Sequence, residues 1–211
     1  MKYTHRTLAF AALIGISLAG YLVADKTGGY EETDLVVNQS VNGVPTLEDA
    51  NGIVHIAKFF DPHLVNPWGV GESSTSFFWI SDNGAGVSPL YNTAGMAQSL
   101  VVSIPAPGQP LGTGGAPTGV VFNTDGGAPG GFPVSGLTSG GLPTSQPAVF
   151  LFVTEDGTIL GWNPMVNPPG FNPAKVGTYG IIAIATPDAV YKGLAVAKEA
   201  AAREAQPIDA G

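Results

Sequence analysis

The sequence predicts an all-β protein built as a partial β-propeller: two full four-stranded antiparallel blades, the first strand of a third blade, and a short helical tail at the C-terminus. Three observations predict this. Glycine and proline supply 30 and 18 of the 211 residues, which excludes a helical bundle. Short runs rich in β-branched and aromatic residues recur between turn residues, as in β-strands. These runs repeat as a unit with a period near 50 residues, which is typical of propellers.

Residues 1–24 are expected to be a signal peptide. Lys2 and Arg6 precede an uncharged run at 8–24, and Ala19 and Ala24 each offer a small residue at a cleavage position. The alternative is a retained anchor, because an apolar run of this length is at the lower limit for a membrane span. Cleavage is favoured, so we expect an exported protein, periplasmic or extracellular, with no membrane contact after cleavage.

Residues 25–65 are interpreted as an N-terminal segment with one lone strand at 34–38. In a propeller, such a strand closes the ring by joining the last blade. The blades themselves are expected within 66–197.

Each blade is predicted to contain a strand led by glycine, an aromatic strand, an acidic-Gly turn, an aromatic-ended strand and an apolar strand. The two full blades are 66–104 and 118–185, and the strand 191–197 opens the third. Innermost strands crowd around a channel, and the leading glycine lets their backbones approach because it has no Cβ. Residues 126–147 are expected to be an inserted loop; long loops are functional or mobile, and mobility is favoured here.

The C-terminal stretch 198–211 is rich in alanine and helix-forming. It differs in composition from the residues before it. We therefore expect a short helical tail that is foreign to the repeat.

Four motifs carry a resemblance: NPWG at 66–69, FWISDNG at 78–84, TEDGTI at 154–159 and YKGL at 191–194. In this order they resemble a family of exported bacterial proteins of unknown function, often associated with PEP-CTERM sorting signals. Its members look like six-bladed propellers of the NHL and gluconolactonase-like type. The resemblance covers about residues 32–197, and the family's later blades are absent, so it implies an N-terminal fragment. It implies a fold and a compartment but no reaction.

Composition restricts the partners. The formal charge is −8, with 16 acidic residues against 8 Lys and Arg, and there is no cysteine. A nucleic-acid partner needs clustered basic residues and is therefore excluded. Disulfides and cysteine-ligated metals are excluded as well. A small molecule or a polysaccharide remains as the expected ligand.

Three residues directly precede the repeated glycine in their units and should lie at one level near the channel: Trp68, Thr118 and Lys192. An indole, a hydroxyl and an ammonium that converge are able to hold an anionic or sugar ligand. Asn66 is the further candidate on the channel side. The alternative is that Trp68 packs between blades, as tryptophans in such positions often do.

Two pairs of hard oxygen ligands occupy equivalent turns, Asp82 with Asn83 and Glu155 with Asp156. They suit Ca²⁺, but this ion takes six or more oxygens and each turn supplies two side chains. The alternative is a hairpin turn in which the side chain bonds its own backbone. We expect no cofactor, with Ca²⁺ as the weaker alternative.

No catalytic motif is found. Asp61 and His63 are able to form a base and its orienting partner, and the alternative is a capped Asp-Pro turn. We therefore expect a non-enzymatic binding or scaffold module. The alternative, which rests on fold analogy, is a metal-assisted lactonase or hydrolase of the gluconolactonase-like type.

Self-association is also expected. Two blades share one interface, which leaves two outer faces open. Four aromatic residues are expected on these faces: Phe78, Trp79, Phe150 and Phe152. Exposed apolar faces of this kind favour association.

Overall fold

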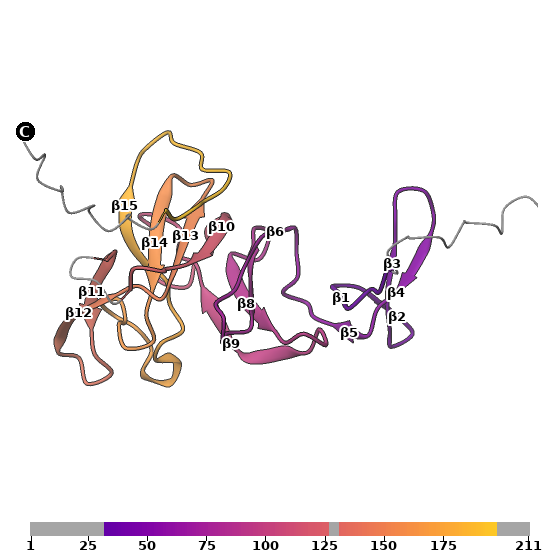
Figure 1. Cartoon of the computed structure of the whole chain (residues 1–211), viewed down its shortest axis with the longest axis horizontal. Helices are drawn as coiled ribbons and strands as arrows, with labels where there is room; N and C mark the ends of the chain where they lie inside the picture. Colours follow the sequence, from indigo (N-terminus) through magenta and orange to yellow (C-terminus); the bar gives the residue numbers. More distant parts are fainter. Residues whose placement is uncertain (1–31, 127–130, 198–211) are drawn as a thin grey trace, which may run out of the picture. The chain divides into compact units, whose positions relative to one another are not determined.

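The computed structural model describes residues 32–126 and 131–197, and over these it is an all-β structure of several small sheets (Figure 1). These described residues contain no α-helix and one short 3₁₀ helix, η1 (Pro173–Lys175). None of their helices reaches the length and apolarity needed to cross a bilayer. The expected signal peptide at 1–24 and the expected tail at 198–211 lie outside the described residues.

The first four-stranded sheet is antiparallel and follows the chain order. Its strands are β6 (Pro67–Gly71), β7 (Phe78–Asp82), β8 (Val87–Tyr91) and β9 (Ala97–Ser103). Their register pairs Trp79 with Leu90 and Ser88 with Val102. Consecutive antiparallel strands need only short turns, and the connections β7–β8 and β8–β9 contain glycine.

The second four-stranded sheet has the same arrangement. Its strands are β10 (Pro117–Phe122), β13 (Phe150–Thr154), β14 (Thr158–Trp162) and β15 (Ile181–Ala185). The turn between β13 and β14 ends at Gly157, whose φ of +75° favours glycine. The prediction of two four-stranded antiparallel units is confirmed.

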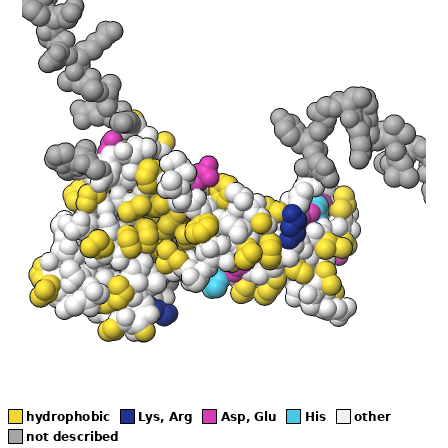
Figure 2. All heavy atoms as spheres, turned by 60° about the horizontal axis from the view of Figure 1, so that its bottom comes forward, with side chains coloured by type: hydrophobic (Ala, Val, Ile, Leu, Met, Phe, Trp, Pro, Cys, Tyr) yellow, Lys and Arg dark blue, Asp and Glu magenta, His cyan; other side chains and the backbone are white. Residues whose placement is uncertain are grey.

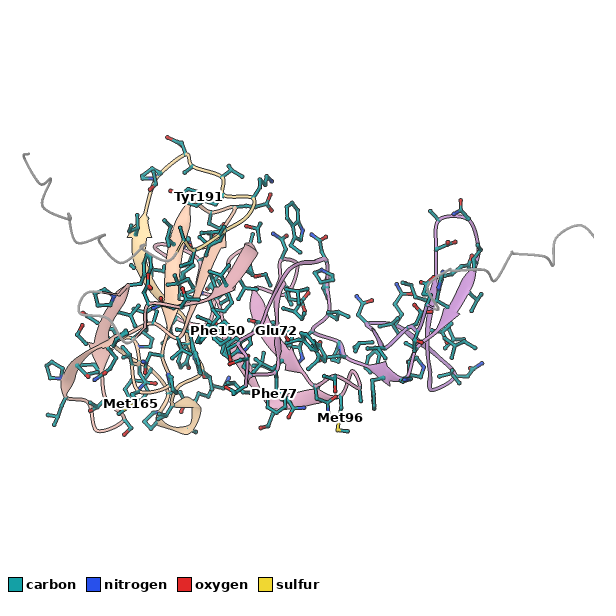
Figure 3. The ribbon with its side chains drawn as sticks, in the orientation of Figure 1. Glu72, Phe77, Met96, Phe150, Met165 and Tyr191 are labelled. Carbon is teal, nitrogen blue, oxygen red and sulfur yellow. The ribbon has the colours of Figure 1, made fainter. Side chains whose placement is uncertain are left out.

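The main hydrophobic core lies between these two sheets. Trp79 of the first sheet stacks on Phe150 of the second, with ring centroids 4.2 Å apart. Trp162 lies 4.7 Å from Trp79, and Phe152 is fully buried beside them. Figure 3 shows Phe150 between the ribbons of the two sheets. The prediction that Trp79, Phe150 and Phe152 line open outer faces is therefore wrong; they form the shared interface.

Two of the repeated glycines permit close backbone contact, as predicted. A Cβ on Gly69 would lie 2.5 Å from the Thr118 carbonyl oxygen, and one on Gly119 would lie 2.6 Å from the Leu194 nitrogen. Real Cβ atoms do not approach backbone this closely. The third glycine, Gly193, has no described atom within 4 Å of its Cβ position.

The insertion at 126–147 is largely a β-hairpin, not the mobile loop that the sequence predicted. Its strands β11 (Pro133–Leu137) and β12 (Pro143–Pro147) pair over five residues each. Val134 is 2% exposed and packs with Leu151 and Ile181 of the second sheet in a second core cluster. The hairpin therefore covers the face of the second sheet that turns away from the first (Figure 1).

The segment 191–197 contains no strand, in contrast to the prediction that it opens a third blade. Leu194 and Val196 still pack against the second core cluster. The segment thus runs beside β10, where its backbone finds no partner strand among the described residues.

The N-terminal segment contains more strand than predicted. β1 (Val36–Val37) pairs in parallel with β5 (Phe59–Phe60), so the expected lone strand at 34–38 joins its own segment rather than a last blade. A three-stranded antiparallel sheet lies between them in sequence. Its strands are β2 (Ser40–Val41), β3 (Val44–Glu48) and β4 (Val54–Ile56).

Candidate functional site

Five side chains from the two four-stranded sheets, their flanking turns and the segment 191–197 meet in one polar cluster, which we call the Glu155 network. Its members are Asn66, Trp68, Asn83, Glu155 and Lys192. Glu155 joins two of them, because its Oε1 pairs with the Lys192 ammonium and its Oε2 accepts a hydrogen bond of 2.9 Å from the Asn83 amide. Asn83 Oδ1 in turn accepts a hydrogen bond of 3.2 Å from the Asn66 amide.

The network forms because its members hold corresponding places at the ends of strands. Asn66 precedes β6, and its φ of +54° is a left-handed conformation that asparagine tolerates better than most residues. Asn83 directly follows β7, and Glu155 directly follows β13. Lys192 comes from the segment after β15, which crosses back beside β10.

Trp68 and Lys192 form the exposed end of the network. The Lys192 ammonium lies 5.2 Å from the centre of the indole ring, within the range of a cation–π contact. Trp68 is 44% exposed. Hydrogen bonds from Lys192 and Asn83, with the Lys192 charge, hold the pKa of Glu155 below its ordinary value. Glu155 therefore remains ionised as the acceptor that fixes both partners.

Such an arrangement is suited to binding a polar, ring-shaped ligand. An exposed indole offers a flat apolar face, and the amides, carboxylate and ammonium offer donors and acceptors around it. Three of the four residues that the sequence proposed as ligand contacts are brought together here: Asn66, Trp68 and Lys192. The fourth, Thr118, is 2% exposed, and its hydroxyl donates to the Tyr191 carbonyl at 2.7 Å. Thr118 thus ties the 191–197 segment to β10.

The network does not fit a divalent cation. The Lys192 ammonium contacts the only carboxylate, and both Glu155 oxygens are occupied. Asn83 Oδ1 accepts from Asn66, so the oxygens that remain are too few for Ca²⁺. We therefore derive no chemistry through a metal at this site.

The two other proposed metal ligands lie elsewhere. Asp156 Oδ2 accepts a hydrogen bond of 2.6 Å from the Ala116 amide, so this carboxylate anchors the start of β10. Asp82 is fully buried. The structure therefore separates the four candidates and leaves only Asn83 and Glu155 in contact.

Asp82 lies near Asp61 and Tyr91, which are also buried, and near the exposed His63. Burial raises the pKa of Asp82 to about 7; the Val65 amide opposes this shift, and the charge of Asp61 adds to it. A carboxyl group with this pKa is largely protonated below neutral pH.

Asp61 is the ionised partner in this cluster. Its Oδ1 accepts from the His63 amide at 2.9 Å and contacts the His63 ring Nδ1 at 2.9 Å, and its Oδ2 accepts from the Tyr91 hydroxyl at 2.8 Å. Burial opposes ionisation, but these hydrogen bonds prevail and hold the pKa of Asp61 below its ordinary value. Burial and the two carboxylates raise the pKa of Tyr91. Asp61 therefore does both things that the sequence allowed. It caps the turn through the His63 amide, and it orients the His63 imidazole through Nδ1.

Sequence reasoning missed Tyr91 and the link between the two turns. Tyr91 reads as an apolar strand residue, and nothing in its neighbourhood indicates a distant carboxylate. The equivalence of Asn83 and Glu155 in the repeat was the available signal for the network, because corresponding turns of adjacent units lie at the same end of both sheets.

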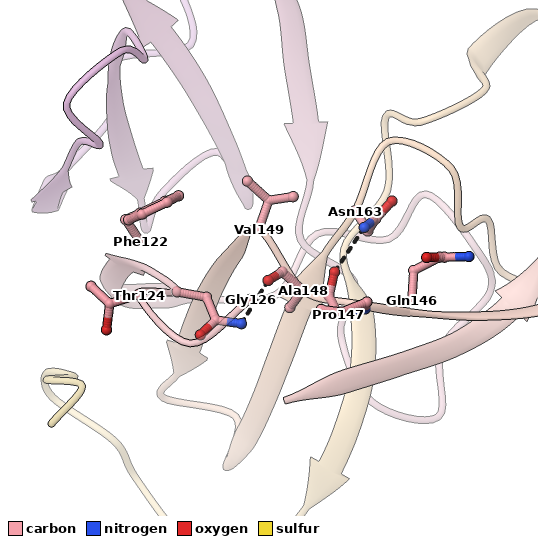
Figure 4. A pocket seen from close by; sticks show the side chains of 9 residues that line it. Phe122, Thr124, Gly126, Gln146, Pro147, Ala148, Val149 and Asn163 are labelled. Atoms are coloured by element: carbon pink, nitrogen blue, oxygen red, sulfur yellow. Dashed lines mark hydrogen bonds between the residues drawn. The ribbon is translucent and has the colours of Figure 1, made fainter. Parts of the chain in front are cut away.

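A hollow of about 410 Å³ lies at the base of the hairpin (Figure 4). Two asparagine amides reach backbone carbonyls there: Asn123 donates to Ala148 and Asn163 to Pro147, both at 2.7 Å. These bonds fix the hairpin to the second sheet, so the amides serve the fold. Elsewhere, Figure 2 shows hydrophobic side chains gathered on the visible face and few Lys or Arg side chains.

Comparison with known proteins gave no match to a family model, a curated protein or a solved structure.

Proposed function

We propose that the chain is an exported, non-enzymatic binding or scaffold module with a partial β-propeller fold, in which each four-stranded sheet is a blade. The sequential strand order of both sheets and the close approach at Gly69 and Gly119 support the fold. The repeat pattern and the resemblance support the family, the exported bacterial proteins often associated with PEP-CTERM signals.

The Glu155 network is the proposed ligand site, and one observation carries this assignment. An exposed tryptophan lies under an ammonium that a carboxylate holds in place, where the two four-stranded sheets meet the segment 191–197. The Trp68 indole is 44% exposed, so its flat face is open to a ligand. The face of an indole packs against the C–H face of a sugar ring, and the surrounding amides and charged groups hydrogen-bond to its hydroxyls. The proposed ligand is therefore a saccharide.

A glycan array tests this function directly. The full chain is expected to bind a subset of saccharides, and Trp68→Ala is expected to weaken the best binder at least tenfold. Phe77→Ala is the matched control, because Phe77 is an aromatic residue of similar exposure, at 45%, that takes no part in the network. Equal binding by the wild type and Trp68→Ala would refute the assignment.

The alternative function is a metal-assisted lactonase or hydrolase, and the meeting of Asn66, Asn83 and Glu155 is the observation in its favour. The Lys192 ammonium argues against a metal here, because it already occupies the Glu155 carboxylate. Elemental analysis of the purified protein distinguishes the two. A stoichiometric divalent ion that is lost in Glu155→Gln would favour the enzyme, and a substoichiometric amount would favour the binding module.

Export is the remaining part of the proposal. It rests on Lys2, Arg6 and the uncharged run at 8–24. Mass spectrometry of the protein from its source cell is expected to find an N-terminus at Gly20 or Asp25. An intact Met1 in the membrane fraction would identify a retained anchor instead.

A further inference from the structure

A groove of about 690 Å³ lies along the edge of the first sheet, and none of its lining residues belongs to the Glu155 network. Strand β9 forms one wall with Ser99, Val101 and Ser103, and the segment 170–179 forms the opposite wall. His63 and the residues 111–112 lie at its borders. Its volume is in the range of ligand pockets in proteins.

Lys175 brings a positive charge to this groove, in a chain that is acidic overall. The chain has 16 acidic residues and 8 Lys and Arg, yet the ionisable side chains lining the groove are His63, Lys175 and Tyr179, with no carboxylate. Within 32–126 and 131–197, no carboxylate lies within 4.0 Å of the Lys175 ammonium. A positive charge in a hollow with low-dielectric walls attracts anions.

The backbone that carries Lys175 is fixed to the first sheet. The Ser103 amide donates to the Thr178 carbonyl at 2.8 Å, and the Gly180 amide donates to the Ser103 carbonyl at 2.9 Å. The Thr178 hydroxyl donates to the Lys175 carbonyl at 2.8 Å. The backbone of Lys175 is therefore already ordered before a ligand binds. Binding does not have to supply the free energy for ordering this backbone.

The His63 ring is oriented by the Asp61 carboxylate. The contact of its Nδ1 with the ionised Asp61 carboxylate, at 2.9 Å, places the proton of the neutral ring on Nδ1. The other ring nitrogen, Nε2, makes no hydrogen bond within the described residues, and the side chain is 49% exposed. The imidazole therefore keeps Nε2 for a ligand.

The remaining lining indicates which anion fits. Hydroxyl groups come from Ser99, Ser103, Thr178 and Tyr179, and apolar side chains come from Val87, Val101 and Leu111. Hydroxyls match a ligand rich in hydroxyl groups, and the apolar wall matches the C–H face of a sugar ring. An inorganic ion would make no use of either.

We propose that this groove binds a uronic acid, with Lys175 and His63 at its carboxylate and with the serine hydroxyls of β9 at its ring hydroxyls. The proposal does not depend on the Glu155 network, which shares no residue with the groove. The acid is either a free monosaccharide or a residue of an acidic polysaccharide, and the two present the same chemistry.

Isothermal titration of the full chain with galacturonate tests the proposal. Binding is expected to weaken as salt is raised, and Lys175→Gln is expected to raise the Kd at least fivefold. Lys58→Gln is the matched control, because it removes the same charge from an exposed lysine outside the groove, and it is expected to leave the Kd unchanged. Thermal unfolding of both variants, expected to match the wild type, excludes a folding defect.

Two further ligands and one further variant complete the test. Galactose, which lacks the carboxylate, is expected to bind at least tenfold more weakly, and tighter binding of trigalacturonate than of galacturonate would identify a polymer as the source. Trp68→Ala is expected to bind galacturonate as the wild type does, which separates this groove from the Glu155 network. Equal affinity of the wild type and Lys175→Gln, or galactose or inorganic phosphate binding as tightly as galacturonate, would overturn the proposal.

Discussion

Trp79 stacks on Phe150 across the interface between the two four-stranded sheets, with ring centroids 4.2 Å apart and ring planes inclined by 22°. The two residues belong to corresponding strands of the two units, β7 and β13. Their contact forms a core that both repeat units share, because neither sheet is able to bury its aromatic face alone.

Truncation of this stack is expected to be costly. Trp79 is 3% exposed and Phe150 is 1% exposed, so Trp79→Ala leaves a cavity that neighbouring rings fill poorly. Losses of about 3–5 kcal/mol in the free energy of unfolding are usual for such changes. Urea unfolding measures the loss, and Phe77→Ala, at an exposed position, is expected to cost less than about 1 kcal/mol. Similar costs for both variants would contradict the interface.

The repeated glycines provide a matched pair. Gly69→Ala places a methyl group 2.5 Å from the Thr118 carbonyl oxygen, whereas Gly193→Ala meets nothing within 4 Å. The backbone at Gly69 has to move, so we expect a loss of about 1–3 kcal/mol there. We expect a change within about 0.5 kcal/mol at Gly193. Denaturant midpoints compare the two, and an equal effect would show that the close approach is absent.

Stability is expected to respond to pH through Asp82. Burial raises the pKa of Asp82 to about 7 in the folded state. Between about pH 4 and pH 7 the folded protein therefore keeps a proton on Asp82 that the unfolded chain has released. The contribution of Asp82 is therefore fully present below about pH 4 and is lost as the pH rises to about 7.

Asp82→Asn removes this dependence. The variant is expected to be more stable than the wild type at pH 8, and this advantage is expected to shrink as the pH falls to 4. Free energies of unfolding at several pH values measure it. An unchanged difference across this range would mean that Asp82 is not protonated in the folded state.

Self-association remains a prediction, and the surface expected to associate is an exposed face of the first sheet. The hairpin covers the outer face of the second sheet through Val134, while Val70 on β6 is 65% exposed. We expect light scattering after size-exclusion chromatography to show species larger than the monomer, and Val70→Lys to reduce them. A single monomeric species in the wild type would contradict this prediction.

The two four-stranded sheets follow from the sequence because their strands are apolar runs bounded by turn residues, among them the acidic-Gly turns. The hairpin β11–β12 does not follow, because its proline- and glycine-rich strands lack an apolar alternation. Only its contact with Leu151 and Ile181 gives Val134 a buried place. The hairpin β2–β3 did carry a signal. Asn42 and Gly43 both have positive φ, as a two-residue hairpin turn requires.

The candidate site was predictable in its members but not in its connections. Trp68 and Lys192 follow from their places directly before the repeated glycine, and Asn66 follows from its expected place on the channel side. Their link through Asn83 and Glu155 depends on how adjacent units pack, which strand patterns leave open. The burial of Thr118 has the same origin, because the 191–197 segment covers it.

The most direct measurement of the proposed saccharide site uses the three tryptophan indole N–H signals in a ¹⁵N-resolved NMR spectrum. Trp79 and Trp162 are buried, and the Trp162 indole donates to the Gly177 carbonyl at 2.8 Å. Titration with the best saccharide from the array is expected to shift the Trp68 signal and to leave these two in place. A Trp68 signal that stays fixed while the saccharide binds would contradict the Glu155 network as the ligand site.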